Sequence, residues 1–197
     1  DAKVVDKDVK LPEERQTSAE TLEADTLEVL ADLNHASQKG LQTIFDSSVG
    51  RSTVNHPLGG RYQITPTEAS VQKLPVQHGV TTTASVMAQG FNPYVAEWSP
   101  YHGAAYAVIE ATARLVAAGA NWSKARFSYQ EYFERMDKQA ERFGQPVSAL
   151  LGSIEAQIQL GLPSIGGKDS MSGTFEELTV PPTLVAFGVT TADSRKI

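Results

Sequence analysis

Six consecutive residues near the end of the chain, Leu184–Val189, carry no charged or hydrogen-bonding side chain. An apolar run of this length is typical of a β-strand that is buried on both faces, because a strand with one face in water alternates apolar and polar side chains. Such a strand needs a layer of structure on each side. We therefore expect a sheet that helices cover on one face and a further partner covers on the other.

Two other segments predict strands. Residues 81–95 place small apolar side chains on one face and longer or polar ones on the other, an alternation typical of a strand. The two faces are Ala84, Val86 and Ala88 against Ser85, Met87 and Gln89. Residues 124–130 predict a further short strand.

Helical periodicity predicts three helices in the second half of the chain. The first follows Ser99, a suitable N-cap residue, has Pro100 at its first position and ends at Gly119. The second spans residues 131–143, and Gly144-Gln145-Pro146 separates it from the third, which ends at Gly161. The apolar stripes are Ala105, Val108, Ile109, Thr112, Leu115 and Val116 in the first helix, and Val147, Leu150, Leu151, Ile154 and Ile158 in the third. We expect these two stripes to cover one face of the sheet.

The N-terminal part is different in character. Residues 1–25 are mostly polar and charged with little periodicity, and we expect a linker there. Apolar residues at helical spacing between residues 26 and 45 predict two short helices with a break at Gly40. We therefore place the folded domain at residues 26–197.

Composition excludes several classes of protein. A net charge of −6 argues against a nucleic-acid partner held through phosphate contacts. The chain has no cysteine, so disulfides and cysteine nucleophiles are excluded within it. No apolar run reaches membrane-spanning length and no signal peptide is visible. We expect a cytoplasmic protein with no membrane partner.

The densest motif is LGLPSIGGKDSMSG, residues 160–173. It is not a nucleoside-triphosphate P-loop, because Gly167 stands where that motif needs Lys, and Asp169 follows Lys168 where it needs Ser or Thr. A dinucleotide fingerprint is also absent, since the sequence lacks G-x-G-x-x-G.

Two readings of this motif stay open from its chemistry alone. Gly166 and Gly167 allow a backbone to approach a ligand closely, and Lys168 offers a cation. Asp169 offers a carboxylate and Ser170 a hydroxyl. The alternative is a glycine turn that joins a helix to a strand, with its charges in water.

Four segments carry a family resemblance: GGKDSMSG (166–173), TTTASVMAQGFNPYVAEWSPYHGAAYAVIEATARLVAAGA (81–120), FSYQEYFERM (127–136) and FEELTVPPTLVAF (175–187). Together they resemble the second half of large phosphoribosylformylglycinamidine synthase, the purine-pathway enzyme also called formylglycinamide ribonucleotide amidotransferase. The similarity extends from about residue 27 to residue 192.

The resemblance implies an α+β domain like the N-terminal domain of aminoimidazole ribonucleotide synthetase. Such a domain has a mixed or antiparallel sheet with helices on one face, and the other face pairs with a like domain. Residues 26–197 match the second domain of this type in the parent enzyme. The remaining domains, including the glutaminase that supplies ammonia, would lie outside this chain, which we expect to be a fragment that is inactive alone.

The family's reaction implies a site. ATP phosphorylates the amide oxygen of formylglycinamide ribonucleotide, and ammonia from glutamine displaces phosphate, while Mg²⁺ neutralises charge on the transferred group. By the match, Gly166, Gly167 and Lys168 would bind the nucleotide. Asp169 and Ser170 would bind the ribonucleotide.

Large members of the family also hold an auxiliary nucleotide through Mg²⁺, and the resemblance assigns a metal ligand to Glu110. Two further ligand positions of that site hold Arg114 and His78, and a guanidinium repels a metal ion. Glu110 and Arg114 also have the i, i+4 spacing of a helical ion pair. We favour the ion pair and expect the auxiliary site to be lost or altered.

Two functions of different class remain. The domain forms one wall of an ATP and ribonucleotide site, or it is a pseudo-symmetric scaffold with no direct catalytic contact. In either case the uncovered sheet face predicts that the isolated chain forms a homodimer.

Overall fold

The computed structural model describes residues 18–44 and 51–197, which fall into two compact units. The smaller unit contains two short helices, α1 (Leu22–Ala31) and α2 (Lys39–Gln42). Two short helices were expected here, but α1 begins inside the expected linker, and Gly40 lies within α2 instead of breaking a helix. Neither helix has a buried residue, and the apolar side chains of Leu27 and Leu30 are exposed.

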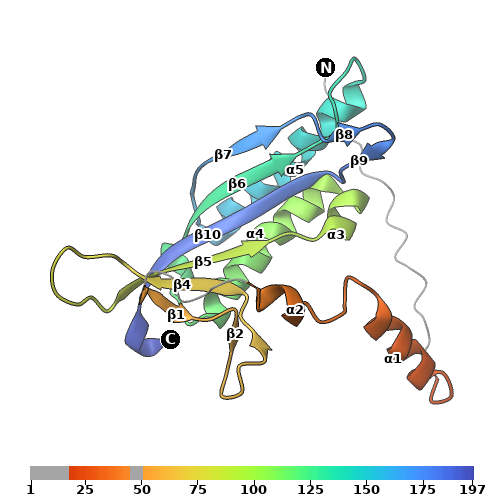
Figure 1. The fold of residues 1–197 in the computed structure, drawn as a ribbon. Coiled ribbons are helices and arrows are strands. Elements are labelled where there is room, and N and C mark those ends of the chain that lie inside the picture. Colours follow the sequence, from red (N-terminus) through yellow and green to blue (C-terminus); the bar gives the residue numbers. More distant parts are fainter. Residues whose placement is uncertain (1–17, 45–50) are drawn as a thin grey trace. The chain divides into compact units, whose positions relative to one another are not determined.

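The larger unit is built on a six-stranded sheet with strand order β1-β4-β5-β10-β6-β7 (Figure 1). All neighbouring strands are antiparallel except β6 and β7, which are parallel. The strands are β1 (Thr53–Asn55), β2 (Leu58–Gly59), β3 (Thr65–Pro66), β4 (Ala69–Lys73), β5 (Thr83–Gly90), β6 (Arg126–Tyr132), β7 (Ser164–Ser170), β8 (Thr174–Phe175), β9 (Leu178–Thr179) and β10 (Thr183–Asp193). The helices are α3 (Pro93–Trp98), α4 (Pro100–Ala117) and α5 (Ala140–Leu160), with 3-10 turns at Trp122–Lys124 and Ser194–Lys196. The expected α+β class with a mostly antiparallel sheet is confirmed.

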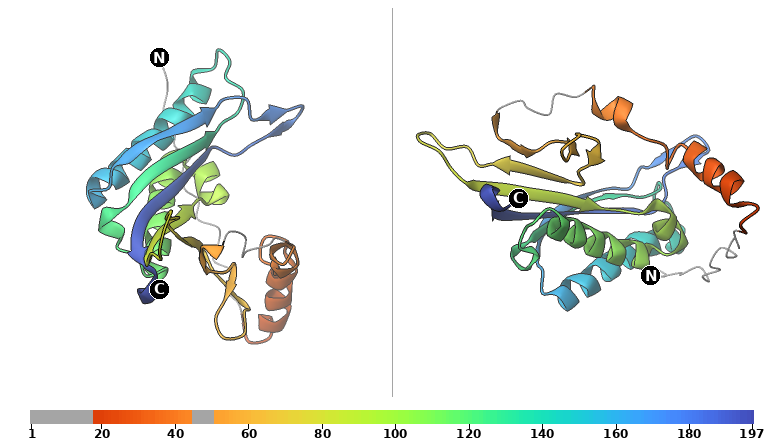
Figure 2. Two further views of the ribbon diagram at one scale, coloured as in Figure 1. Left: turned by 60° about the vertical axis from the view of Figure 1, so that its left-hand side comes forward. Right: turned by 90° about the horizontal axis from the view of Figure 1, so that it is seen from below.

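The long strand β10 lies between β5 and β6, as its apolar sequence predicts. Both α4 and α5 cover the same face of the sheet, which the view from below shows most clearly (Figure 2). On that face Leu184 and Ala186 are buried. On the opposite face Val185 and Phe187 are only half-buried and Val189 is exposed, so this unit's long helices cover one face and leave the other open.

Strand β5 and helix α4 follow the sequence closely. The residues expected on one face of β5, including Val86, are buried, and Met87 on the other face is exposed. The side chain of Ser99 caps α4 by accepting a hydrogen bond from the backbone N–H of His102. Pro100 occupies the first helical position, where its missing N–H has no helical partner.

The apolar stripe of α4 is only partly the expected one: Val108, Thr112 and Leu115 are buried as predicted. Ile109 and Val116 are exposed, while the small residues Ala107 and Ala111 are buried. The reason is close packing: a Cβ atom at Gly90 in β5 would overlap the backbone carbonyl of Ala107. Small side chains face the sheet because larger ones would hold the helix away from it.

The helix expected over residues 131–143 is wrong. Strand β6 continues through Tyr132, because Glu131 pairs with Leu184 of β10. Residues 133–139 then form a loop, and α5 starts at Ala140.

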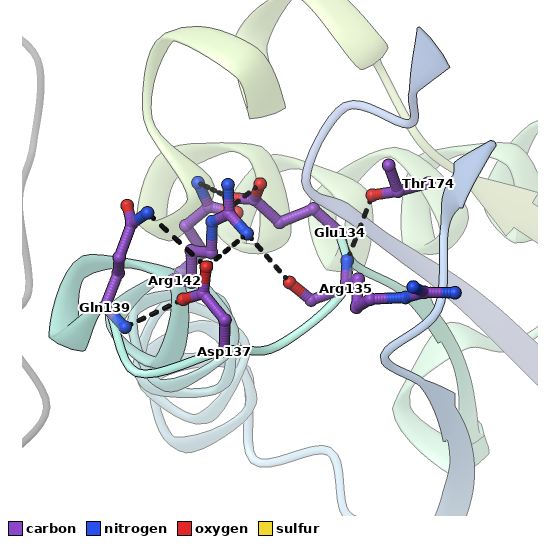
Figure 3. Close-up of polar contacts among 7 residues, drawn as sticks. Glu134, Arg135, Asp137, Gln139, Arg142 and Thr174 are labelled. Atoms are coloured by element: carbon purple, nitrogen blue, oxygen red, sulfur yellow. Dashed lines mark hydrogen bonds and ion pairs between the residues drawn. The ribbon is translucent and has the colours of Figure 1, made fainter. Parts of the chain in front are cut away.

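Arg142 fixes this loop against the start of α5 (Figure 3). Its guanidinium lies 3.1 Å from a carboxylate oxygen of Glu134 and 2.7 Å from one of Asp137, and it donates to the carbonyl of Arg135. The helix then runs without interruption through Pro146, although proline removes one hydrogen bond from a helix interior. Pro146 is buried in this helix.

The exposed and buried faces of α5 are opposite to those expected. The predicted apolar stripe, which includes Leu150, Ile154 and Ile158, is largely exposed. The buried face consists of Gly144, Pro146, Ser148, Ala149, Gly152, Ser153 and Ala156. A Cβ atom at Gly152 would overlap the carbonyl of Tyr101 in α4, so these small residues let the two helices pack closely.

Candidate functional site

The glycine motif forms strand β7, which corrects the alternative of a glycine turn that joins a helix to a strand. The αL conformation of Gly161 ends α5, as expected, and β7 then pairs in parallel with β6. β7 is the last strand in the sheet order, so one edge of its backbone has no strand partner in the described part of the chain. The motif therefore lies at a sheet edge.

The strand separates the five expected site residues onto two faces. Gly167 and Asp169 pair with Tyr129 and Glu131 of β6, whose side chains point toward α5. The residues between and beyond them in β7, Gly166, Lys168 and Ser170, share the open face with Ser128, Gln130 and Tyr132. A ligand that lies along the sheet edge could contact both groups.

A groove of about 380 Å³ lies between α5 and β7. Its apolar wall comes from Leu150 and Ile154 of α5, and its polar wall includes Glu131 and Asp169. Glu131 is 6% exposed, and burial together with the charge of Asp169 raises the pKa of its carboxyl to about 7. Near neutral pH this carboxyl is therefore balanced between its acid and carboxylate forms.

Tyr129 lies beside this carboxylate pair on the same face of β6. The residue is only 8% exposed, and burial raises the pKa of its phenol above the ordinary value. Its hydroxyl is buried and has no hydrogen-bond partner within residues 18–44 and 51–197. An unpaired buried hydroxyl is uncommon in folded proteins and marks a place where a ligand or water could bind.

The open face carries a second hollow, of about 450 Å³, lined by residues of β6, β7 and β10. Lys168 and Ile165 of β7 border it together with Phe187. The side chain of Gln130 donates to the backbone carbonyl of Lys168 at 3.0 Å, which fixes this part of the strand. Ser170 lies 3.2 Å from Ser172, hydroxyl to hydroxyl.

The two glycines have different physical roles. Gly166 has a φ of +141°, which favours glycine, and a Cβ there would meet no atom within 4 Å. A Cβ at Gly167 would lie 2.7 Å from the carbonyl oxygen of Tyr129. The neighbouring strand alone therefore requires glycine at 167, whereas Gly166 faces open space that a ligand could use.

Glu110 forms the ion pair that its spacing predicts. One oxygen lies 2.9 Å from the guanidinium of Arg114, and the other accepts a hydrogen bond from the backbone N–H of Phe91. His78 is exposed in the β4–β5 loop. Within residues 18–44 and 51–197, no three His, Cys, Asp or Glu side chains form a group that could hold a metal ion. Mg²⁺ does not fit at Glu110.

Sequence reasoning missed Glu131 because it assigned this residue to a helix, and it placed Tyr129 in a strand without identifying it as a site residue. The signal that could have found them is the pattern FSYQEYF, in which every second side chain from Phe127 is buried. That alternation extends the predicted strand through the acidic residue and places both side chains on the helix-covered face.

In the described residues, no helix has the length and apolar character needed to cross a membrane. Neither protein-family models nor curated proteins gave a match to the sequence. The fold is an α+β domain, in which a mostly antiparallel sheet carries α4 and α5 on one face. Solved structures of other proteins match this fold.

The structures that match include several of PurL from Thermotoga maritima, one of them described as phosphoribosylformylglycinamidine synthase II. PurLQS matches 81% of this chain with a TM-score of 0.65 at 18% identity, over 24% of its own length. PurL complexed with ATP matches 82% at a TM-score of 0.63 and 16% identity, over 24% of its length. PurL complexed with FGAR matches 76% at a TM-score of 0.59 and 19% identity, over 22% of its length. The chain thus spans about a quarter of these proteins, and the resemblance expected from the sequence is confirmed at the level of the fold.

Proposed function

We propose that this chain is one synthetase domain of an ATP-dependent ligase of purine biosynthesis in the cytoplasm. The parent enzyme would convert formylglycinamide ribonucleotide, glutamine and ATP to formylglycinamidine ribonucleotide. The observation that carries the proposal is the fold shared with PurL structures determined with ATP and with FGAR. Since the chain spans about a quarter of those proteins, the ammonia source and the rest of the site would be supplied by other domains.

The exposed edge of β7 is the proposed contribution to the site. Gly166 and Gly167 would let the phosphates of ATP approach the backbone closely, and Lys168 would neutralise their charge. Ser170 and Asp169 would bind the ribonucleotide, with Asp169 reaching it from the face that carries Glu131. Mg²⁺ would enter with ATP at this shared site, because Glu110 is already paired with Arg114.

Single substitutions in the complete enzyme that contains this domain test the proposal. Lys168→Ala and Ser170→Ala should each lower kcat/KM for amidine formation by about 100-fold, the usual effect of losing one group that stabilises transferred charge. Lys124→Ala, an exposed lysine in the 3-10 turn before β6, is the matched control and should leave turnover unchanged. Normal turnover in both β7 variants would refute the site and favour the scaffold function.

A second experiment concerns the isolated chain. With ATP, ammonia and formylglycinamide ribonucleotide, it should form no amidine, because one domain would supply only one wall of the site. Measurable amidine formation from the purified chain would contradict the assignment of missing parts.

The open sheet face is the proposed surface for a like domain. Its central part is apolar, with Met87 and Val189 directly paired across β5 and β10 and both exposed. Phe187 and Val185 continue this surface along β10. In the isolated chain a second copy would cover it by a two-fold contact.

Sedimentation equilibrium tests this contact. The wild-type chain, of 21.2 kDa, should sediment as a dimer at tens of micromolar, and Val189→Glu should give a monomer. Ile158→Glu is the control, since Ile158 is 70% exposed on α5, which lies on the other face of the sheet. A wild-type monomer, or a dimer that only Ile158→Glu dissociates, would contradict the proposed surface.

A further inference from the structure

The guanidinium of Arg114 is held by oxygen atoms from three separate segments. It lies 2.9 Å from a carboxylate oxygen of Glu110 in α4 and 3.3 Å from one of Glu68, the residue before β4. It also donates to the backbone carbonyl of Gln89 in β5, at 2.9 Å. Two anionic oxygens and one carbonyl oxygen therefore converge on a single positive charge.

This set of atoms is what a hard divalent cation would use. Carboxylate and backbone carbonyl oxygens are the preferred ligands of Mg²⁺ and Ca²⁺, and water completes their coordination. We propose that Arg114 is a built-in cation that fills an oxygen-lined cation site formed by Glu110, Glu68 and the carbonyl of Gln89. In the wild-type chain the guanidinium replaces a divalent metal ion, and its removal opens the site to one.

The surrounding structure keeps these oxygens in place independently of Arg114. The second oxygen of Glu110 accepts a hydrogen bond from the backbone N–H of Phe91 at 2.8 Å. Gly90 packs directly on the Ala107 carbonyl, which ties the end of β5 to α4. Glu110 and the carbonyl of Gln89 therefore stay close together when the arginine side chain is lost.

The family resemblance implies a metal ion at Glu110, whereas the structure has an arginine there, and the two exclude each other for a simple physical reason. The resemblance implies a metal ligand at Glu110, but a positive guanidinium at contact distance repels a divalent ion and occupies the same oxygens. The inference concerns cation binding alone and does not depend on the proposed ligase activity.

Thermal unfolding and calorimetry with Mg²⁺ or Mn²⁺ as the probe test it on the full chain. Wild-type protein should have the same Tm in EDTA and in either metal. Arg114→Asn should have a lower Tm in EDTA, and a metal concentration of about ten times Kd should raise it by roughly 3–5 °C. Arg114→Gln, which keeps more of the aliphatic stem, is the second variant if Arg114→Asn does not fold.

Two controls decide the origin of any metal response. Glu110→Gln combined with Arg114→Asn should lose the response, and Arg114→Lys, which keeps the positive charge, should show none. A wild-type metal response that Glu110→Gln abolishes would overturn the inference. Folded Arg114→Asn or Arg114→Gln protein that gains no metal response would overturn it as well. In either case the ligase proposal would still stand on its own test.

Discussion

Glu131 should make the stability of the larger unit depend on pH. Its carboxyl has a pKa of about 7 in the folded chain, against 4.5 ordinarily, mainly because of burial and secondly because of Asp169. At about 1.4 kcal/mol per pKa unit, this difference corresponds to about 3 kcal/mol of unfolding free energy. That is a large part of the stability of an ordinary domain.

The sign follows from proton binding. Between pH 4.5 and about 7 the folded chain keeps the Glu131 proton and the unfolded chain releases it. The stabilisation that this bound proton gives the folded chain is fully present below pH 4.5. It declines as the pH rises and has been lost by about pH 7. Glu131→Gln keeps the size of the side chain and cannot ionise. We therefore compare the free energy of unfolding of the variant with that of wild type. The difference, variant minus wild type, should be about 2–3 kcal/mol larger at pH 8 than at pH 4.5.

Urea unfolding at pH 4.5, 6, 7 and 8 measures this difference. The fluorescence of Trp98 and Trp122 reports on the same unit as Glu131. Glu177→Gln, at an exposed position in the β8–β9 hairpin, is the matched control and should follow wild type at every pH. If Glu131→Gln and wild type differ by the same amount at all four pH values, the buried-carboxylate reasoning is wrong.

Three further predictions concern packing and are checked by urea unfolding. Gly152→Ala should lower the free energy of unfolding by about 3 kcal/mol or more, because its Cβ would overlap a backbone carbonyl of α4. Gly40→Ala, whose Cβ would meet no atom within 4 Å, should not lower it. Gly167→Val and Gly173→Val should lower the free energy of unfolding by similar amounts, since a Cβ at either position would meet a carbonyl oxygen at 2.7 or 2.8 Å; an unchanged unfolding midpoint for Gly167→Val would mean that packing on Tyr129 does not require that glycine. Arg142→Ala should lose about 1–2 kcal/mol through its half-buried ion pairs, and an unchanged midpoint would mean that the loop before α5 is held by other contacts.

The sequence alone predicted those features that depend on residues close together along the chain. The cap of Ser99, the end of α5 at Gly161 and the pairing of Glu110 with Arg114 each depend on residues within a few positions of one another. The alternation in β5 and the two-sided apolar character of β10 also followed, because strand periodicity is local. The α+β class and the family came from the resemblance of four sequence segments, residues 81–120, 127–136, 166–173 and 175–187.

Tertiary structure decided the rest. Whether Glu131 continues a strand or starts a helix depends on its pairing with β10, which lies about fifty residues further along the chain. The exposed apolar stripe of α5 was predicted to be buried, since periodicity identifies a face but close packing of Gly152 on α4 chooses which face is covered. The motif Gly166–Ser170 became an edge strand with its side chains on two faces, because β6 was available to pair with it. Local hydrogen bonds set the elements that the sequence reveals, and long-range pairing and burial set their faces and their partners.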